Sequence, residues 1–180
     1  MAYGVFQANG QSFDLGHLDE KVISITIGGE EHRILVEFTD HCFTEEALPN
    51  DDRPKFAPCS RKDGRFCEER WKASLDIWEH IHLAVRGWVW LGEHDRCLVV
   101  KLEATDDTPS LHYVIPFTLE RSKGDRRAKL KMLVRSAFLW DDPSERPATF
   151  GVVKFNTLVV LALKGAKPRR NYDRNRKTPW

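Results

Sequence analysis

The sequence predicts an α+β fold, in which a mostly antiparallel sheet carries one long helix, about residues 65–86, packed on one face. Three observations lead to this prediction. Short apolar runs separated by polar turns recur along most of the chain, a pattern typical of antiparallel strands. One segment instead repeats its apolar side chains every three or four residues, as one face of a helix does. The length of 180 residues and the hydrophobic content of 41% fit one globular domain.

The first predicted element is a hairpin. The segment VISITI, 22–27, alternates and is rich in β-branched residues, which favours a strand. Gly28 and Gly29 supply a turn that accepts positive φ, and HRILVEF, 32–38, returns as the partner strand. Residues 40–63 then form a connection with three prolines and many acids. Because loops of this length in a compact domain are often functional or mobile, we expect a site at its edge.

The helix predicted for residues 65–86 follows this loop. Six side chains at mostly helical intervals form its inner face, namely Phe66, Trp71, Ser74, Trp78, Ile81 and Val85. Acidic side chains near its start suit the helix dipole, and Gly87 is a natural stop.

The regular segments after Gly87 are all predicted as strands. Short polar turns separate most of them, so the order is expected to be antiparallel. The predicted strands span residues 88–92, 96–103, 110–120, 128–140, 150–155 and 157–163. The prediction is therefore a single domain from 1 to 163.

A basic tail, 164–180, is expected to follow the domain and to be flexible. It contains seven lysines and arginines against one aspartate, a local charge of about +6. Such a tail can neutralise phosphates, and it can equally be a solvated end that keeps the protein soluble. The nucleic-acid-binding candidates are Lys167, Arg169, Arg170, Arg174, Arg176 and Lys177.

The sequence lacks the motifs of several functional classes. The sequence contains no G-x-x-x-x-G-K-[ST] and no G-x-G-x-x-G loop, so no cofactor is expected. Three of the four cysteines, together with His41, have the atom types of zinc ligands but not the paired spacing, so no metal is predicted. Without a signal-peptide core or a membrane-length apolar window, the cysteines are expected to be reduced thiols of a cytoplasmic protein.

The remaining candidates for chemistry are a histidine and two arginines. His41 follows a strand at the mouth of the long loop, and Arg65 and Arg70 lie near the start of the predicted helix. Metal-independent RNA cleavage needs a base, an acid and cations on the phosphate. Histidine titrates near neutrality and arginine holds phosphate in a fixed fork. The sequence therefore predicts that these side chains meet in one cationic hollow, with Tyr113 and Ser136 on nearby strands.

The stretches RFCEERWKAS, 65–74, and LVRSAF, 133–138, resemble a group of bacterial and phage-borne ribonuclease-toxin domains, the barnase–EndoU–colicin–RelE superfamily. The resemblance covers roughly residues 38–163. It implies a helical segment before a four-stranded antiparallel sheet, with a histidine, basic residues and a hydroxyl side chain across the sheet. His41, Arg65, Arg70, Tyr113 and Ser136 match these roles.

The leading prediction is a metal-independent ribonuclease, or a ribonuclease-like toxin domain, that acts on RNA and has an inhibitor or immunity protein as partner. One alternative is a non-catalytic module that binds a protein or a nucleic acid, and a third possibility is an enzyme of unrecognised type that uses the same pocket. Each candidate residue also has a structural explanation. These are surface ion pairs for the arginines, core anchoring for the tyrosine, close strand packing for the serine and loop hydrogen bonding for the histidine.

Overall fold

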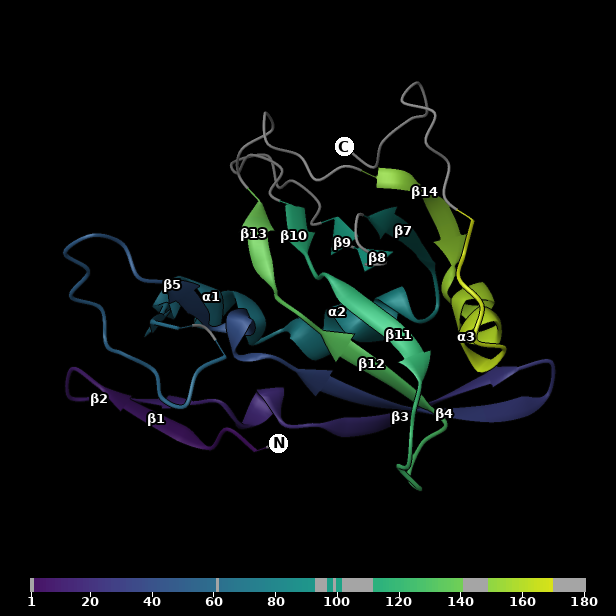
Figure 1. Cartoon of the computed structure of the whole chain (residues 1–180), viewed down its shortest axis with the longest axis horizontal. Coiled ribbons are helices and arrows are strands. Elements are labelled where there is room, and N and C mark those ends of the chain that lie inside the picture. Colours follow the sequence, from purple (N-terminus) through teal and green to yellow (C-terminus); the bar gives the residue numbers. More distant parts are fainter. Residues whose placement is uncertain are drawn as a thin grey trace.

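The chain folds into mostly antiparallel sheets with three α-helices in the part that the computed structural model describes, residues 2–60, 62–92, 97–98, 100–101, 112–140 and 149–169 (Figure 1). The predicted fold class is confirmed. The strands are β1 (Val5–Ala8), β2 (Gln11–Asp14), β3 (Lys21–Ile27), β4 (Glu30–Phe38), β5 (Thr44–Glu46), β6 (Gly64–Phe66), β7 (Trp88–Gly92), β8 (Cys97–Leu98), β9 (Val100–Lys101), β10 (His112–Val114), β11 (Phe117–Arg121), β12 (Leu130–Val134), β13 (Phe138–Trp140) and β14 (Thr149–Lys154). The helices are α1 (Glu68–Ser74), α2 (Ile77–Ala84) and α3 (Phe155–Leu163), with 3-10 turns η1 (Gly16–Leu18) and η2 (Asp40–Cys42).

The largest sheet has seven strands in the order β14-β7-β8-β11-β12-β4-β3. The predicted hairpin is confirmed, since β3 and β4 pair antiparallel with Ile23 opposite Ile34, and Gly28 and Gly29 take φ values of 60° and 86°. One pair, β4 and β12, is parallel, with Leu130 opposite Ile34. This parallel pair brings the end of β4 next to the end of β12, where the candidate site lies.

The helices α2 and α3 cover one face of this sheet. Val134 lies opposite both Phe117 and Phe38, so the three side chains point to the same face. The Phe38 ring is 5.2 Å from the Trp78 ring of α2, and the Phe117 ring is 6.2 Å from the Phe155 ring of α3. The prediction that helical structure packs on one face is therefore confirmed.

The prediction of one long helix over residues 65–86 is wrong, because the chain makes two short helices there. The first turn of the predicted segment belongs to β6, and α1 ends at Ser74. The Ser74 hydroxyl donates to the Trp71 carbonyl at 2.7 Å and lies 2.7 Å from Nε2 of His17. A serine that bonds back to its own helix competes with the regular backbone pattern. At Asp76, ψ is 13°, and α2 begins with the next residue.

The prediction of a strand at residues 157–163 is also wrong, since this segment lies in α3. The buried side chains Phe155, Leu158, Val159 and Ala162 recur at helical spacing. Gly165 follows with φ of 67°, a conformation that ends many helices and favours glycine. A run of six apolar residues, 158–163, carries too little periodicity to separate a buried strand from a buried helix. In the described residues, no helix is both long and apolar enough to cross a membrane.

A second hairpin precedes the predicted one. Strands β1 and β2 pair antiparallel around Asn9 and Gly10, whose φ values are 50° and 76°. Positive φ at both turn positions is what an Asn-Gly pair favours, so the signal was present in the sequence. Residues 40–63, predicted as an irregular loop, contain η2 and β5, and β5 pairs antiparallel with β6.

Candidate functional site

The end of β4 is fastened to the segment after β12. The Thr39 N–H donates to the Val134 carbonyl at 3.0 Å, and the Thr39 hydroxyl donates to the Arg135 carbonyl at 2.7 Å. The chain then turns through η2, which places Cys42 in the core at 0% exposure. His41 therefore lies within a short 3-10 turn between two strands rather than at the mouth of an irregular loop.

Asp40, the first residue of η2, holds the distant part of the 47–63 loop. The residue is 5% exposed, and its carboxylate accepts hydrogen bonds from the Cys59 thiol at 2.6 Å, the Ser60 N–H at 2.7 Å and the Ser60 hydroxyl. Burial raises the pKa of this carboxyl group, but the hydrogen bonds from Cys59 and Ser60 outweigh burial and lower the pKa below its usual value. Asp40 is therefore an ionised, structural anchor.

Arg70, on α1, contacts two of the other four predicted catalytic residues. Its Nη1 donates to the His41 carbonyl at 3.1 Å and to Oγ of Ser136 at 3.0 Å, and its Nε donates to Glu45 at 2.9 Å. The Ser136 hydroxyl donates to the same His41 carbonyl at 3.2 Å. The structure brings His41, Arg70 and Ser136 together, but these contacts of His41 use its backbone oxygen.

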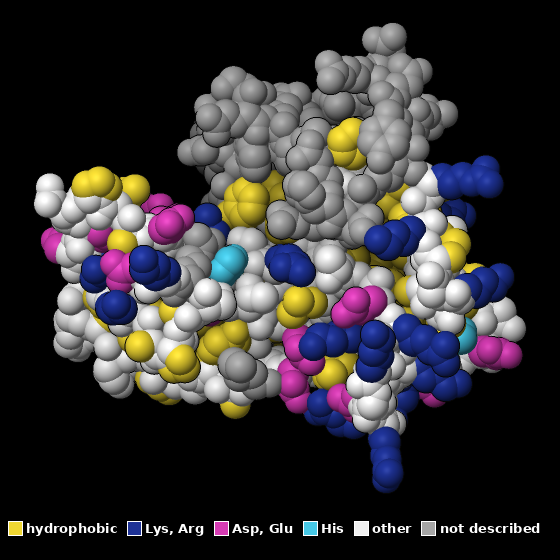
Figure 2. All heavy atoms as spheres, viewed as in Figure 1, with side chains coloured by type: hydrophobic (Ala, Val, Ile, Leu, Met, Phe, Trp, Pro, Cys, Tyr) yellow, Lys and Arg dark blue, Asp and Glu magenta, His cyan; other side chains and the backbone are white. Residues whose placement is uncertain are grey.

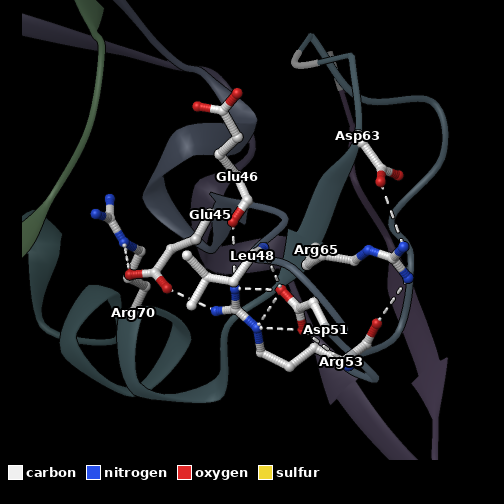
Figure 3. A network of polar contacts seen from close by, with 8 residues as sticks. All are labelled: Glu45, Glu46, Leu48, Asp51, Arg53, Asp63, Arg65 and Arg70. Carbon is white, nitrogen blue, oxygen red and sulfur yellow. Dashed lines mark hydrogen bonds and ion pairs between the residues drawn. The ribbon is translucent and has the colours of Figure 1, made fainter.

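The Glu45 carboxylate is shared between two arginines (Figure 3). Its second oxygen accepts a bond from Nη1 of Arg53 at 2.6 Å, and Arg53 also donates to Asp51 through Nε and Nη2. Burial raises the pKa of Glu45, yet the bonds from Arg70 and Arg53 lower it overall. This network, which we call the Glu45 network (Glu45, Asp51, Arg53 and Arg70), was missed from the sequence. The density of charges between residues 45 and 53 was the only local signal for it.

Arg65 lies apart from Arg70. It stands opposite Glu45 in the β5–β6 pair, yet its Nη1 donates to the Arg53 carbonyl at 3.1 Å and its Nη2 to Asp63 at 3.3 Å. Figure 3 shows the Arg65 and Arg70 side chains pointing away from each other on opposite sides of Arg53. The two arginines therefore do not share one phosphate-sized hollow.

Tyr113, on β10, is a core residue. It is 1% exposed, its ring centroid is 4.7 Å from that of His80, and its hydroxyl has no hydrogen-bond partner among the described residues. Burial raises the pKa of its hydroxyl group. Because solvent and substrate cannot reach its phenol, Tyr113 is not part of the group of residues around Arg70.

A pocket of about 610 Å³ lies beside the Glu45 network. Its floor includes the buried rings of Phe13 and Phe66, whose centroids are 4.6 Å apart. Its walls come from the β1–β2 turn, the 45–54 segment and the start of α1. Glu45 and Arg53 line it, whereas His41 and Ser136 do not. The pocket and the predicted catalytic residues are therefore different places.

The described cations concentrate on the last residue of β11 and the connection to β12, residues 121–129, which we call the basic hairpin. It carries five lysines and arginines and one aspartate. Arg127 pairs with Glu20 at 2.7 Å and with Asp125 at 2.8 Å. The other four make no salt bridge with any residue that the structure describes, and all five are exposed, namely Arg121, Lys123, Arg126, Arg127 and Lys129. Figure 2 shows dark blue side chains gathered over this hairpin.

Only part of the predicted basic tail can be placed. Lys167 and Arg169 are exposed beyond the end of α3, and Arg170, Arg174, Arg176 and Lys177 lie outside the described residues. The described part of the chain holds no group of three or more His, Cys, Asp and Glu side chains arranged to bind a metal ion.

One comparison with known proteins gives a match. The model of the YjaZ family matches residues 5–163, which is most of the chain. No curated protein and no solved structure matches. This chain belongs to the YjaZ family.

Proposed function

We propose that this protein is a non-catalytic module that binds RNA, and that the basic hairpin contacts the phosphate backbone. The observation that carries the proposal is the set of four exposed cations that have no anionic partner among the described residues. The formal net charge of the whole chain is only +1, so this cluster is a local feature and not the result of a basic composition.

The hairpin geometry suits backbone contact. Ser122 N–H donates to the Lys129 carbonyl at 2.8 Å, which closes the loop, and Gly124 has φ of 86° at its tip. A closed hairpin presents its long side chains outward with little main-chain entropy left to lose. Lysine and arginine side chains that are free of ion pairs can neutralise phosphates and release the counterions around the RNA.

The salt dependence of binding tests the proposal. Each phosphate contact to a single strand contributes about −0.7 to the slope of log K against log salt, so four contacts give a slope of about −3. Between about 50 and 200 mM salt, RNA binding is expected to weaken roughly fiftyfold. The variant with Lys123→Ala and Arg126→Ala should halve the slope, as measured by fluorescence anisotropy with labelled RNA.

The matched control changes the same net charge elsewhere. Lys62 and Lys72 are exposed on the β6–α1 side of the molecule, so the variant with both replaced by alanine loses two positive charges away from the hairpin. This control should keep the wild-type slope. Equal slopes for wild type and the hairpin variant would contradict the assignment of the surface.

The second candidate function is metal-independent ribonuclease activity, supported by the convergence of His41, Arg70 and Ser136. In that proposal the His41 imidazole takes the proton of the 2′-hydroxyl, and the remaining N–H groups of Arg70 hold the phosphate. Incubation of the purified protein with total RNA and EDTA tests it. Cleavage that His41→Ala abolishes supports a ribonuclease, whereas binding without cleavage supports the module.

A further inference from the structure

Trp88, the first residue of β7, is the most exposed aromatic side chain whose burial the structure describes. It leaves 57% of its surface accessible, whereas Trp71, Trp78 and Trp90 are partly buried. The next residue, Val89, is fully buried, as the alternation of a strand requires. The indole therefore lies on the side of β7 that faces away from the core.

The neighbours of Trp88 are cationic. Lys154 on β14 lies directly opposite Trp88, with its Nζ 5.3 Å from the centroid of the indole ring. Val152, on the same side of β14 as Lys154, is 45% exposed, and Arg86 is exposed just before β7. Neither β7 nor β14 contains an acidic residue. The β14 strand is the terminal strand of the seven-stranded sheet.

We propose that Trp88 is a stacking platform for a base of single-stranded RNA and that Lys154 and Arg86 contact the phosphates on either side of that base. The proposal rests on the proposed RNA binding and adds to it the class of RNA. A nucleobase on the indole ring would take the place of the Lys154 ammonium group, which would then reach the adjacent phosphate. Bases in a duplex are already stacked on both faces, so a platform of this kind selects single strands.

A protein partner fits this corner less well. A stable protein interface buries about 800 Å² on each partner and has an apolar centre. Among the residues that the structure describes on β7 and β14, Trp88 and Val152 are the large apolar side chains that are exposed, which are too few to form such a centre. A stacked base requires a single exposed ring and nearby cations, and the corner supplies both.

The experiment compares two probes, a fluorescein-labelled single-stranded oligouridine and a blunt RNA duplex of the same length. Trp88→Ala should bind the oligouridine about tenfold more weakly than wild type and should bind the duplex equally well. Trp88→Phe keeps an aromatic face and should recover most of the affinity. Leu83→Ala, which removes another exposed apolar side chain, is the matched control and should bind as wild type does. Oligouridine should also quench the tryptophan emission of wild type more than that of Trp88→Phe.

The outcomes separate the two proposals. If the hairpin variant weakens both probes while Trp88→Ala weakens neither, RNA binding stands and the stacking proposal is overturned. The stacking proposal is also overturned if Trp88→Ala weakens duplex and single-strand binding equally. It is overturned as well if a protein partner binds wild type but not Trp88→Ala. If wild type binds neither probe, both proposals fail. Because Trp88 is exposed, circular dichroism is expected to show an unchanged fold for each variant.

Discussion

Replacement of Arg70 by alanine is expected to destabilise the fold more than replacement of Arg65 by alanine. The side chain is 21% exposed and donates to Glu45, to the His41 carbonyl and to the Ser136 hydroxyl at 2.9 to 3.1 Å. Its guanidinium also lies 5.4 Å from the centroid of the Phe138 ring. Arg70 therefore ties α1 to η2, to β5 and to the segment before β13.

The size of the effect follows from which partners are left unpaired. Hydrogen bonds to a charged group contribute about 1.5–3 kcal/mol each. In the variant, Glu45 keeps its bond from Arg53, and the Ser136 hydroxyl still donates to the His41 carbonyl. Partial exposure reduces the contribution further. The expected loss in the free energy of unfolding is about 2–3 kcal/mol, equivalent to roughly 1–1.5 M in the urea midpoint for a typical slope of about 2 kcal/mol per M.

Urea unfolding followed by circular dichroism measures this shift, with Arg65→Ala as the matched control. Arg65 is similarly covered at 23% exposure, but its two bonds are 3.1 and 3.3 Å long and its carboxylate partner, Asp63, also binds Lys55. Its removal should cost about 1 kcal/mol. Arg70→Lys should recover less than half of the loss, because one ammonium group cannot reach three acceptors in different directions. Equal midpoints for the two alanine variants would refute the argument.

Two further predictions concern pH. Burial lowers the pKa of His17 and of His80. As the pH falls, these histidines therefore bind protons in the unfolded chain before they do so in the folded chain. Their contribution to stability is complete above about pH 6.5 and is lost as the pH falls through the folded-state values. The urea midpoint should decrease between about pH 7 and pH 5, and it should decrease less in the variant with His17→Gln and His80→Phe. An equal decrease in the variant would show that these histidines do not cause the pH dependence. Asp40 acts at lower pH, because its lowered pKa stabilises the fold above about pH 4 and this stabilisation is lost on further acidification. Asp40→Asn should therefore lower the urea midpoint at pH 7 by the equivalent of about 2 kcal/mol. It should also reduce the further decrease of the midpoint below about pH 4, and a decrease as steep as in wild type would assign the loss of stability to another carboxylate.

The parts of the fold that the sequence predicts correctly are those whose signals are local. The β3–β4 hairpin follows from alternation and two glycines, and the burial of Ile81 and Val85 follows from their helical spacing. A distant contact lies at the break before α2, since the hydroxyl of Ser74, the last residue of α1, is within hydrogen-bond distance of His17. The helical state of α3 depends on its burial against β11, because its own seven apolar residues fit either period.

The candidate site, too, is only partly predictable from local signals in the sequence. The residue types were evident from the sequence. Arg70 does contact His41 and Ser136, which lie 29 and 66 positions away from it along the chain. Their proximity depends on the parallel pairing of β4 with β12, which places η2 beside the segment after β12. The partner of Arg70, Glu45, and the burial of Tyr113 depend on the same packing.

By itself, therefore, the sequence determined the fold class, the first long hairpin and the clusters of charge, because alternation, turn chemistry and charge density act between neighbours. Tertiary structure alone decided which charges are neutralised and which are left exposed. Arg53 and Arg70 are held by carboxylates, whereas Lys123 and Arg126 on the basic hairpin face solvent without an ion pair to any described residue. The physical reason is that an ion pair requires a distance of a few ångströms, and that distance is set by which strands and loops the fold places together.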